Sequence, residues 1–240
     1  MEPRLKLSKQ RSNPPVDVML YRNIVGSLRY LVQTRPDISF AIGMVSRFME
    51  APTTEHMSAV KHQLRYVSGT MDIGCSYTSA PGGAHLIDYS DADLAGDIDD
   101  RKSTAGTLFF FADCLVSWQS QKQRVVALSS CESEYIAAAT AACQGVWLGF
   151  LLGNLLGTDP LVADLHVDNK STIQLIKNPV FHDSIKHIEV RYHNIRNCAE
   201  NGTIVVQFVG TEDQLADILT KALGRVRLQM LREKIKVVKV

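Results

Sequence analysis

The stretch Tyr89-Ser90-Asp91-Ala92-Asp93 closes a short apolar run, residues 84–90, whose composition favours a β-strand. Its two carboxylates stand two residues apart, so on a pleated strand both leave the same face. Clustered carboxylates repel one another unless a cation holds them, and oxygen ligands favour hard ions such as Mg²⁺ or Mn²⁺. Three later segments carry acids in similar settings: Glu132 and Glu134 opening a long helix, Asp168 ending the strand 165–167, and Asp213 and Asp217 in a helix after the strand 203–209. The sequence therefore predicts a metal site formed by four acids on one sheet.

Length and composition are those of an ordinary globular chain. Its 240 residues, 45% of them hydrophobic, suffice for one large domain or a domain and a half. The net charge of +1 gives no argument for nucleic-acid binding by bulk charge. The five cysteines form no C-x-x-C pair, which is typical of reduced thiols inside a cell. The N-terminus has no signal-peptide core, and we find no run of about 18 apolar residues. We therefore expect an intracellular protein, cytoplasmic or nuclear, that is neither secreted nor membrane-bound.

The first third of the chain has a helical pattern. Residues 1–16 are polar and aperiodic and are predicted to be a tail or linker, whereas 17–80 carry apolar stripes at three- and four-residue spacing. Lys61, His62 and Arg65 share a different helical face; a solvated surface is the favoured interpretation and a phosphate-contacting surface the alternative. The stripes predict three helices, at about 21–34, at about 36–50, and from Thr53 or Thr54 to a stop at Gly69.

Beyond Gly74 the periodicity shortens to that of strands, and helices return later. Three successive strands are predicted at 84–90, 104–111 and 115–118. Strands that are then interleaved with helices predict an α/β fold with a mixed sheet, antiparallel first and parallel later. The later elements are a long alanine-rich helix at 130–156, a strand at 165–167, helices at 171–177 and 186–200, a strand at 203–209, and a final helix where Thr211 and Gln214 match a capping box.

Six blocks of the sequence carry the acids in a distinctive setting. They are YSDAD at 89–93, RKST at 101–104, VVALSSCESEY at 125–135, VDN at 167–169, KHIEVRYH at 186–193 and QLADILTK at 214–221. In these blocks, and in their order, the chain resembles the ribonuclease H domain of copia-type retrotransposon Pol polyproteins. The segment YRNIVGSLRYL at 21–31, with TRPDI at 34–38, is similar to the piece of the same polyproteins that joins reverse transcriptase to ribonuclease H.

The resemblance implies a fold and a division of the chain. Residues 84–221 would form a ribonuclease H-like α/β domain, a mixed five-stranded sheet flanked by helices. Residues 17–80 would be a small helical segment like the C-terminal end of a reverse transcriptase, and 222–240 a C-terminal helix or tail. Polymerases of this kind carry a Tyr-x-Asp-Asp motif, which this sequence lacks. We therefore expect a fragment without a polymerase active site.

The resemblance also implies a chemistry, the hydrolysis of the RNA strand of an RNA–DNA hybrid with two Mg²⁺ or Mn²⁺ ions as cofactors. The partners implied are the hybrid and a reverse transcriptase core. The family's four metal-binding acids fall on Asp91, Glu134, Asp168 and Asp217, in the four segments already singled out. Candidate contacts to the nucleic acid are Arg101, Lys102, Ser103, Asn169, Lys186, His193 and Arg196.

Two acidic doublets each offer one member to a metal. Glu132 and Glu134 lie about 200° apart around a helix, so both cannot face the sheet. Counting by three, four and seven from Glu134 reaches mostly small residues, which suit a helix face against strands, whereas Glu132 leads to bulkier ones. In the strand, Asp91 lies deeper in the run than Asp93, which is at its fraying end. We therefore predict Glu134 and Asp91 as the ligands.

Two functional classes remain open. The first is a metal-dependent ribonuclease, and the second is a catalytically silent transposon-derived fragment that only binds nucleic acid or protein. The intact set of acids favours the first. A related-fold integrase is disfavoured by the blocks at 186–193 and 214–221. A zinc site at His182, His187 and His193 is disfavoured because their intervals fit no finger pattern.

Overall fold

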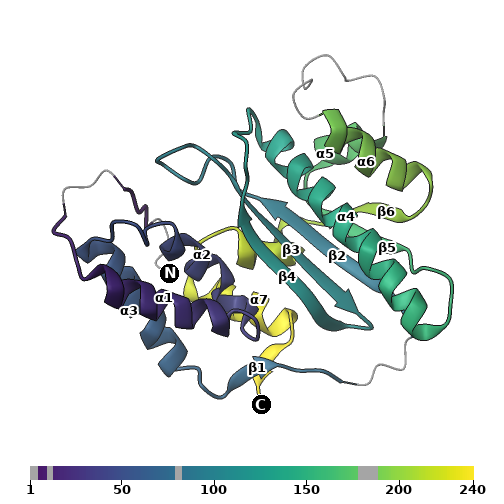
Figure 1. The fold of residues 1–240 in the computed structure, drawn as a ribbon. Helices are drawn as coiled ribbons and strands as arrows, with labels where there is room; N and C mark the ends of the chain where they lie inside the picture. Colours follow the sequence, from purple (N-terminus) through teal and green to yellow (C-terminus); the bar gives the residue numbers. More distant parts are fainter. Residues whose placement is uncertain (1–4, 10–12, 79–82, 178–188) are drawn as a thin grey trace.

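The computed structural model describes residues 5–9, 13–78, 83–177 and 189–240, and its centre is a five-stranded sheet (Figure 1). The strand order is β4-β3-β2-β5-β6. β2, β3 and β4 are antiparallel neighbours, whereas β5 pairs parallel with β2 and with β6. The predicted mixed sheet, antiparallel first and parallel later, is confirmed. The strands are β2 (Leu86–Ala92), β3 (Thr104–Phe111), β4 (Cys114–Lys122), β5 (Ala163–Val167) and β6 (Ile204–Phe208).

The sheet is buried on both faces, as successive side chains of β3 show. Phe109 packs in a core cluster with α4 (Ser130–Leu156), whereas Leu108 and Phe110 belong to a second cluster with the C-terminal elements. This division follows from the strand geometry, because neighbouring side chains point to opposite faces. Helices α5 (Lys170–Lys177) and α6 (Glu189–Glu200) contribute to the first cluster beside α4 (Figure 1).

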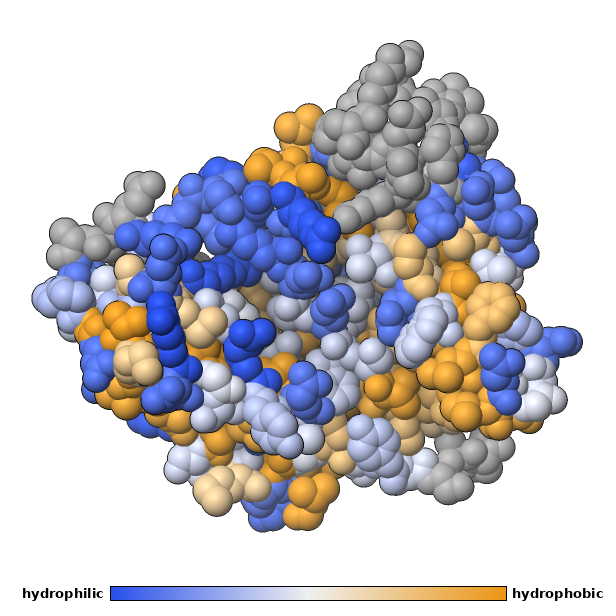
Figure 2. All heavy atoms as spheres, in the orientation of Figure 1, coloured by the Kyte–Doolittle hydropathy of each residue, from blue (hydrophilic) through white to orange (hydrophobic). Residues whose placement is uncertain are grey.

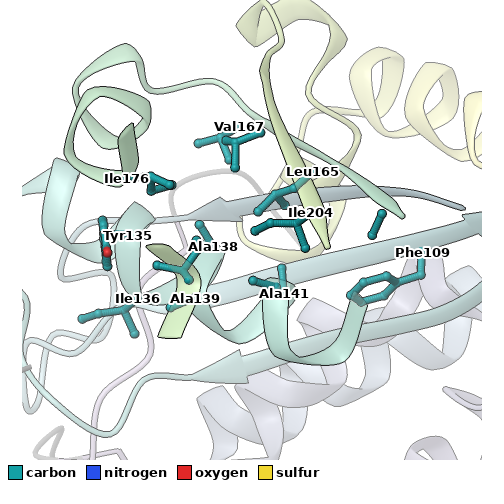
Figure 3. Packing of buried hydrophobic residues seen from close by; sticks show 14 of the residues in the cluster. Phe109, Tyr135, Ile136, Ala138, Ala139, Ala141, Leu165, Val167, Ile176 and Ile204 are labelled. Atoms are coloured by element: carbon teal, nitrogen blue, oxygen red, sulfur yellow. The ribbon is translucent and has the colours of Figure 1, made fainter. Parts of the chain in front are cut away.

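Helix α4 lies close on the sheet because its inner side is built from small residues. Ser129 caps it by accepting a hydrogen bond from the Glu132 amide at 3.2 Å, and Gly157 ends it with a left-handed φ of 67°. Ala138 and its alanine neighbours are buried among strand side chains (Figure 3). A Cβ added at Gly145 would lie 3.1 Å from the Ala163 Cβ of β5, so even one methyl group is tight there. The predicted bounds of this helix are confirmed.

By length and composition alone, α4 could cross a membrane, and it alone among the described helices meets that test. No unbroken apolar run marks this helix in the sequence, because alanine, glycine and a few polar residues interrupt the strongly apolar ones without adding much charge. Within the protein, 56% of the apolar window of α4 is buried. Burial of this kind is what the core helix of a globular fold shows.

The N-terminal helices form a second layer with a core of their own. Buried Tyr21 donates its hydroxyl hydrogen to the Val45 carbonyl oxygen at 2.8 Å, which joins the first and second helices. The predicted helix at 36–50 is divided, because Pro36 opens a 3-10 turn and the α-helix after it stops at Ser46. The elements are α1 (Val18–Leu31), η1 (Pro36–Ile38), α2 (Ser39–Ser46) and α3 (Thr54–Ser68).

Side chains and a small second sheet join this layer to the large sheet. Arg47 after α2 donates to Asp97 at 3.1 Å and to the Thr104 hydroxyl at 2.9 Å. Trp118 on β4 donates from its indole nitrogen to the Val32 carbonyl at 3.0 Å. After α7 (Arg225–Lys234), strand β7 (Val237–Lys239) pairs antiparallel with β1 (Ile73–Cys75). Residues 222–240, predicted as a separate helix or tail, thus pair with the helical segment predicted at 17–80.

The predicted N-terminal tail is in part packed. Within 1–16, Leu7 is buried in the core of the helical layer, and the Ser8 hydroxyl donates to Asp99 at 2.5 Å. Pro15 forms a β-bridge with Thr53 at the start of α3. One apolar residue among polar ones has no periodicity, which is why the sequence pattern missed this contact.

The predicted final helix after 203–209 is wrong. Two 3-10 turns, η4 (Thr211–Asp213) and η5 (Leu215–Leu219), stand there instead. Gln214 between them has an extended backbone, donates to the Ser90 carbonyl at 2.9 Å and accepts from the Ala216 amide. Because the Gln214 side chain bonds to β2 and caps η5, it forms no capping box with Thr211.

Candidate metal centre

Three acids converge at one edge of the large sheet. Asp91 on β2, Glu134 on the second turn of α4 and Asp168 directly after β5 each offer a carboxylate oxygen. These three oxygens all lie within 4.8 Å of one another. Asp91 is fully buried, Glu134 is 7% exposed and Asp168 is half-buried. Three converging oxygens of this kind match the ligands that Mg²⁺ and Mn²⁺ prefer.

The register of the parallel strands explains why two of the acids meet. Ser90 of β2 pairs with Val167 of β5, so the next residues, Asp91 and Asp168, leave adjacent strands at the same level. Helix α4 places Glu134 beside these two acids, because the helix packs on β2 and β5 through its small inner residues. Each acid thus sits on a rigid element whose position is determined by the core.

Electrostatic repulsion in this cluster is strong. Burial, and next the charges of Asp91 and Asp168, raise the pKa of Glu134 to about 10. A protonated Glu134 shares a hydrogen bond with Asp91 in this state. A divalent cation reverses such a shift, because it favours the ionised form of every carboxyl group around it.

Unsatisfied oxygens show that the centre fits a cation. Among the described residues, Glu134 Oε2 and Asp168 Oδ1 are buried without a hydrogen-bond donor. Buried polar atoms normally have a partner, and an acceptor left alone costs about 1–3 kcal/mol. A divalent ion bound among the three acids would satisfy two such acceptors.

Asp217 stands apart from the three-acid cluster and is held by basic side chains. Lys221 Nζ lies 2.5 Å from Asp217 Oδ1 and 3.3 Å from Asp91 Oδ2, so one ammonium group links the two acids. Arg227 on α7 approaches the other Asp217 oxygen at 3.4 Å. The Thr220 hydroxyl donates to Asp91.

Burial and charge together shift the pKa values of Lys221 and Asp217. Burial lowers the pKa of Lys221, but the charges of Asp91 and Asp217 outweigh it and raise that pKa overall. Burial raises the pKa of Asp217, against the hydrogen bond from Lys221. Lys221 was not among the residues predicted for the site, although its place four residues after Asp217 in the block 214–221 is the spacing of a helical ion pair.

The other members of the acidic doublets point elsewhere. Glu132 accepts a hydrogen bond from the Leu128 amide at 2.7 Å, and Asp93 accepts one from the Thr104 amide. Burial raises the pKa of Asp93 to about 6. Asp213 pairs with Lys234 at 2.8 Å on the surface.

The predicted nucleic-acid contacts are scattered. Arg101 is exposed with a left-handed φ of 59°, and half-buried Lys102 pairs with Asp100. Asn169 accepts from the Thr172 amide at the start of α5. Two of the candidates are buried, contrary to a contacting role: Ser103, which accepts from the Ala95 amide, and Arg196, which donates to the Leu175 carbonyl. Lys186, the side chain of His193, and the disfavoured zinc histidines His182 and His187 lie outside the described residues.

The sheet order and directions, with acids at the ends of β2 and β5 and on α4, define a ribonuclease H-like α/β fold. No family model matches the sequence. In an alignment of 243 positions that covers its whole length, the chain is 43% identical to the retrovirus-related Pol polyprotein from transposon RE1 of Arabidopsis thaliana. It is 43% identical over 95% of its length to that from transposon TNT 1-94 of Nicotiana tabacum. Over its whole length the chain is therefore a homologue of one segment of copia-type retrotransposon Pol polyproteins.

The chain spans a small part of these relatives, 16% of the RE1 polyprotein and 18% of the TNT 1-94 polyprotein. Among solved structures it is similar to ribonuclease H1 from the halophilic archaeon Halobacterium salinarum. That likeness has a TM-score of 0.43 and 14% identity, and it covers 57% of this chain and 94% of the other.

Proposed function

We propose that this chain is a metal-dependent endonuclease that hydrolyses the RNA strand of RNA–DNA hybrids. The observation that carries the proposal is the cluster of Asp91, Glu134 and Asp168, with its two orphan oxygens. Homology to a segment of the Pol polyproteins supports the same chemistry. A reverse transcriptase core, the part of such polyproteins that carries a Tyr-x-Asp-Asp motif, is the proposed protein partner.

In the proposed mechanism the chain supplies carboxylates and position. Asp91, Glu134 and Asp168 would hold one Mg²⁺ or Mn²⁺ ion, and Asp91 with Asp217 would hold the second. Bound divalent ions activate a water and stabilise the leaving 3′ oxygen of the scissile phosphate. Glu134 must give up its proton before it can bind as a carboxylate. Lys221 must move aside from Asp217, because its ammonium group stands between the two acids.

The proposed substrate is recognised by shape. An A-like hybrid displays backbone phosphates and 2′-hydroxyl groups rather than readable base edges. Among the described residues, exposed Arg101 is a predicted contact that is open to a phosphate backbone. We therefore expect weak sequence preference in the cleavage pattern.

The test is cleavage of an end-labelled hybrid in Mg²⁺, in Mn²⁺ and in chelator. Asp168→Asn removes a ligand and keeps side-chain size, so we expect it to abolish cutting with the fold intact. Asp91→Asn and Glu134→Gln should each lower kcat at least about 100-fold, about 2.7 kcal/mol in the barrier. Glu132→Gln is the matched control and should stay within about tenfold, since it caps a backbone amide. Equal cutting by wild type and Asp168→Asn would identify a contaminating nuclease and overturn the proposal.

A second candidate function is a fragment that binds nucleic acid without cutting it. The observation in its favour is that Lys221 and Arg227 already neutralise Asp217. Hybrid binding by the wild type, with no cleavage in either metal, would establish this alternative.

A further inference from the structure

A groove between α3 and α7 carries a charge of one sign. Its volume is about 600 Å³. Arg65 from α3 and Arg225 and Arg232 from α7 line it, with His62 beside them, and no carboxylate is among its lining residues. Tyr66 and Leu228 add apolar surface. The α3 wall of the groove belongs to the helical segment predicted at 17–80, and the α7 wall comes from residues more than 150 positions later.

This concentration of positive charge is local. The whole chain has a net charge of +1, and hydrophilic and hydrophobic residues are interspersed over the face shown in Figure 2. Three acids close to these lining residues have partners. Asp37, which accepts from the Tyr66 hydroxyl, forms an ion pair with Arg35 at 2.7 Å, and Asp72 pairs with Lys239 at 3.0 Å. Glu233 on α7 accepts a hydrogen bond from the Gln229 side chain at 3.1 Å.

One donor in the groove has no acceptor. Among the described residues, Arg232 Nε is buried without a hydrogen-bond partner, although the same guanidinium group donates to the Tyr66 hydroxyl oxygen at 3.4 Å. A buried donor left alone costs free energy, which an incoming acceptor would recover. The planar guanidinium fork matches phosphate oxygens in particular.

Helix α7 links the groove to the metal centre. Arg227 on this helix reaches Asp217 at 3.4 Å, while Arg225 and Arg232 of the same helix line the groove. All three arginines stand on one ten-residue helix about 15 Å long, so their backbone positions lie within that length of one another. A duplex bound at the centre carries about one phosphate charge per 1.7 Å of its axis, so its backbone spans this separation.

We propose that the groove between α3 and α7 binds the phosphate backbone of the hybrid a few base pairs from the cut. The inference rests on the proposed function and adds a second anchoring site to it. The groove then holds substrate without taking part in the chemistry. Its loss should weaken binding and raise KM more than it lowers kcat.

The test compares two hybrids and two sets of substitutions by fluorescence anisotropy in chelator. The groove variant is Arg65→Gln, Arg225→Gln and Arg232→Gln together. The control variant removes the same charge from exposed positions elsewhere: Lys6→Gln, Arg29→Gln and Lys177→Gln. On a hybrid of about 24 base pairs, the groove variant should bind at least about tenfold more weakly, and the slope of log affinity against log salt should fall by about 2 to 3.

Length dependence and controls make the result decisive. A hybrid of about 6 base pairs is about 20 Å long and can barely span both sites, so the groove substitutions should weaken its binding much less than they weaken binding of the long hybrid. Equal binding of the long hybrid by wild type and groove variant overturns the proposal, and so does groove-dependent binding of polyglutamate in preference to the hybrid. If the triple substitution fails to fold, Arg225→Gln, at an exposed position, replaces it with an expected loss of about threefold. The two proposals fail separately, because the anisotropy measurement needs no cleavage. If the wild type does not cut the hybrid in Mg²⁺ or Mn²⁺, the proposed function is wrong whatever the groove binds.

Discussion

Replacing Glu134 with glutamine should stabilise the metal-free protein at neutral pH. Burial and the charges of Asp91 and Asp168 raise the pKa of Glu134 from 4.5 to about 10. At pH 7 this group is therefore protonated in the folded chain and ionised in the unfolded chain. Folding must take up a proton, and that costs free energy. Glutamine has the same size, stays neutral and can still donate a hydrogen bond to Asp91.

The magnitude follows from the two pKa values. The contribution of Glu134 to stability is full below its unfolded pKa of 4.5 and falls as the pH rises toward about 10. The loss is about 1.4 kcal/mol per pH unit, so at pH 7 it reaches about 3 kcal/mol. For a chain of this length, each kcal/mol moves Tm by about 2–4 °C. Glu134→Gln should therefore raise Tm by about 6–12 °C at pH 7 and by much less near pH 5.

Thermal melts in chelator between about pH 5 and pH 8 measure this difference. Glu132→Gln is the control, because it removes one carboxylate two residues away, where the side chain caps the Leu128 amide. Adding Mg²⁺ should stabilise the wild type more than Glu134→Gln, and calorimetry should detect proton release on binding. A lower Tm for Glu134→Gln at pH 7, or a difference that does not change with pH, would refute the reasoning.

Two further predictions concern the cations around the centre and the joint between layers. Lys221→Met should lower Tm without metal, because it leaves the carboxylate of Asp217 without its ammonium partner. The same substitution should raise Mn²⁺ affinity about tenfold, because the ion no longer displaces an ammonium group. Unchanged affinity by titration calorimetry would contradict this prediction. Arg47→Ala breaks the bonds to Asp97 and Thr104 and should cost about 2 kcal/mol in urea unfolding. Exposed Arg29→Ala is its control, and equal midpoints would show that the joint adds no stability.

Local patterns were enough to predict much of the fold. The alanine-rich stripe predicted α4, and the shorter periodicity beyond Gly74 predicted β3, because burial imposes a helical or strand period on the sequence. The same helical geometry favoured Glu134 over Glu132, and the structure brings Glu134 to Asp91 and Asp168. The final helix was predicted wrongly, because the backbone there follows the bond from Gln214 to the Ser90 carbonyl, 124 residues earlier in the chain.

Local patterns in the sequence specify which acids this protein has to gather, the mixed sheet that gathers three of them and the polyprotein segment that the chain resembles. Three other features arise only in the folded chain: Lys221 stands between Asp91 and Asp217, β7 pairs with β1, and α3 and α7 enclose a basic groove. The physical reason is the range of the interactions. Periodicity and capping act over a few residues and are written in the local sequence, whereas ion pairs and grooves depend on the path that brings distant segments together.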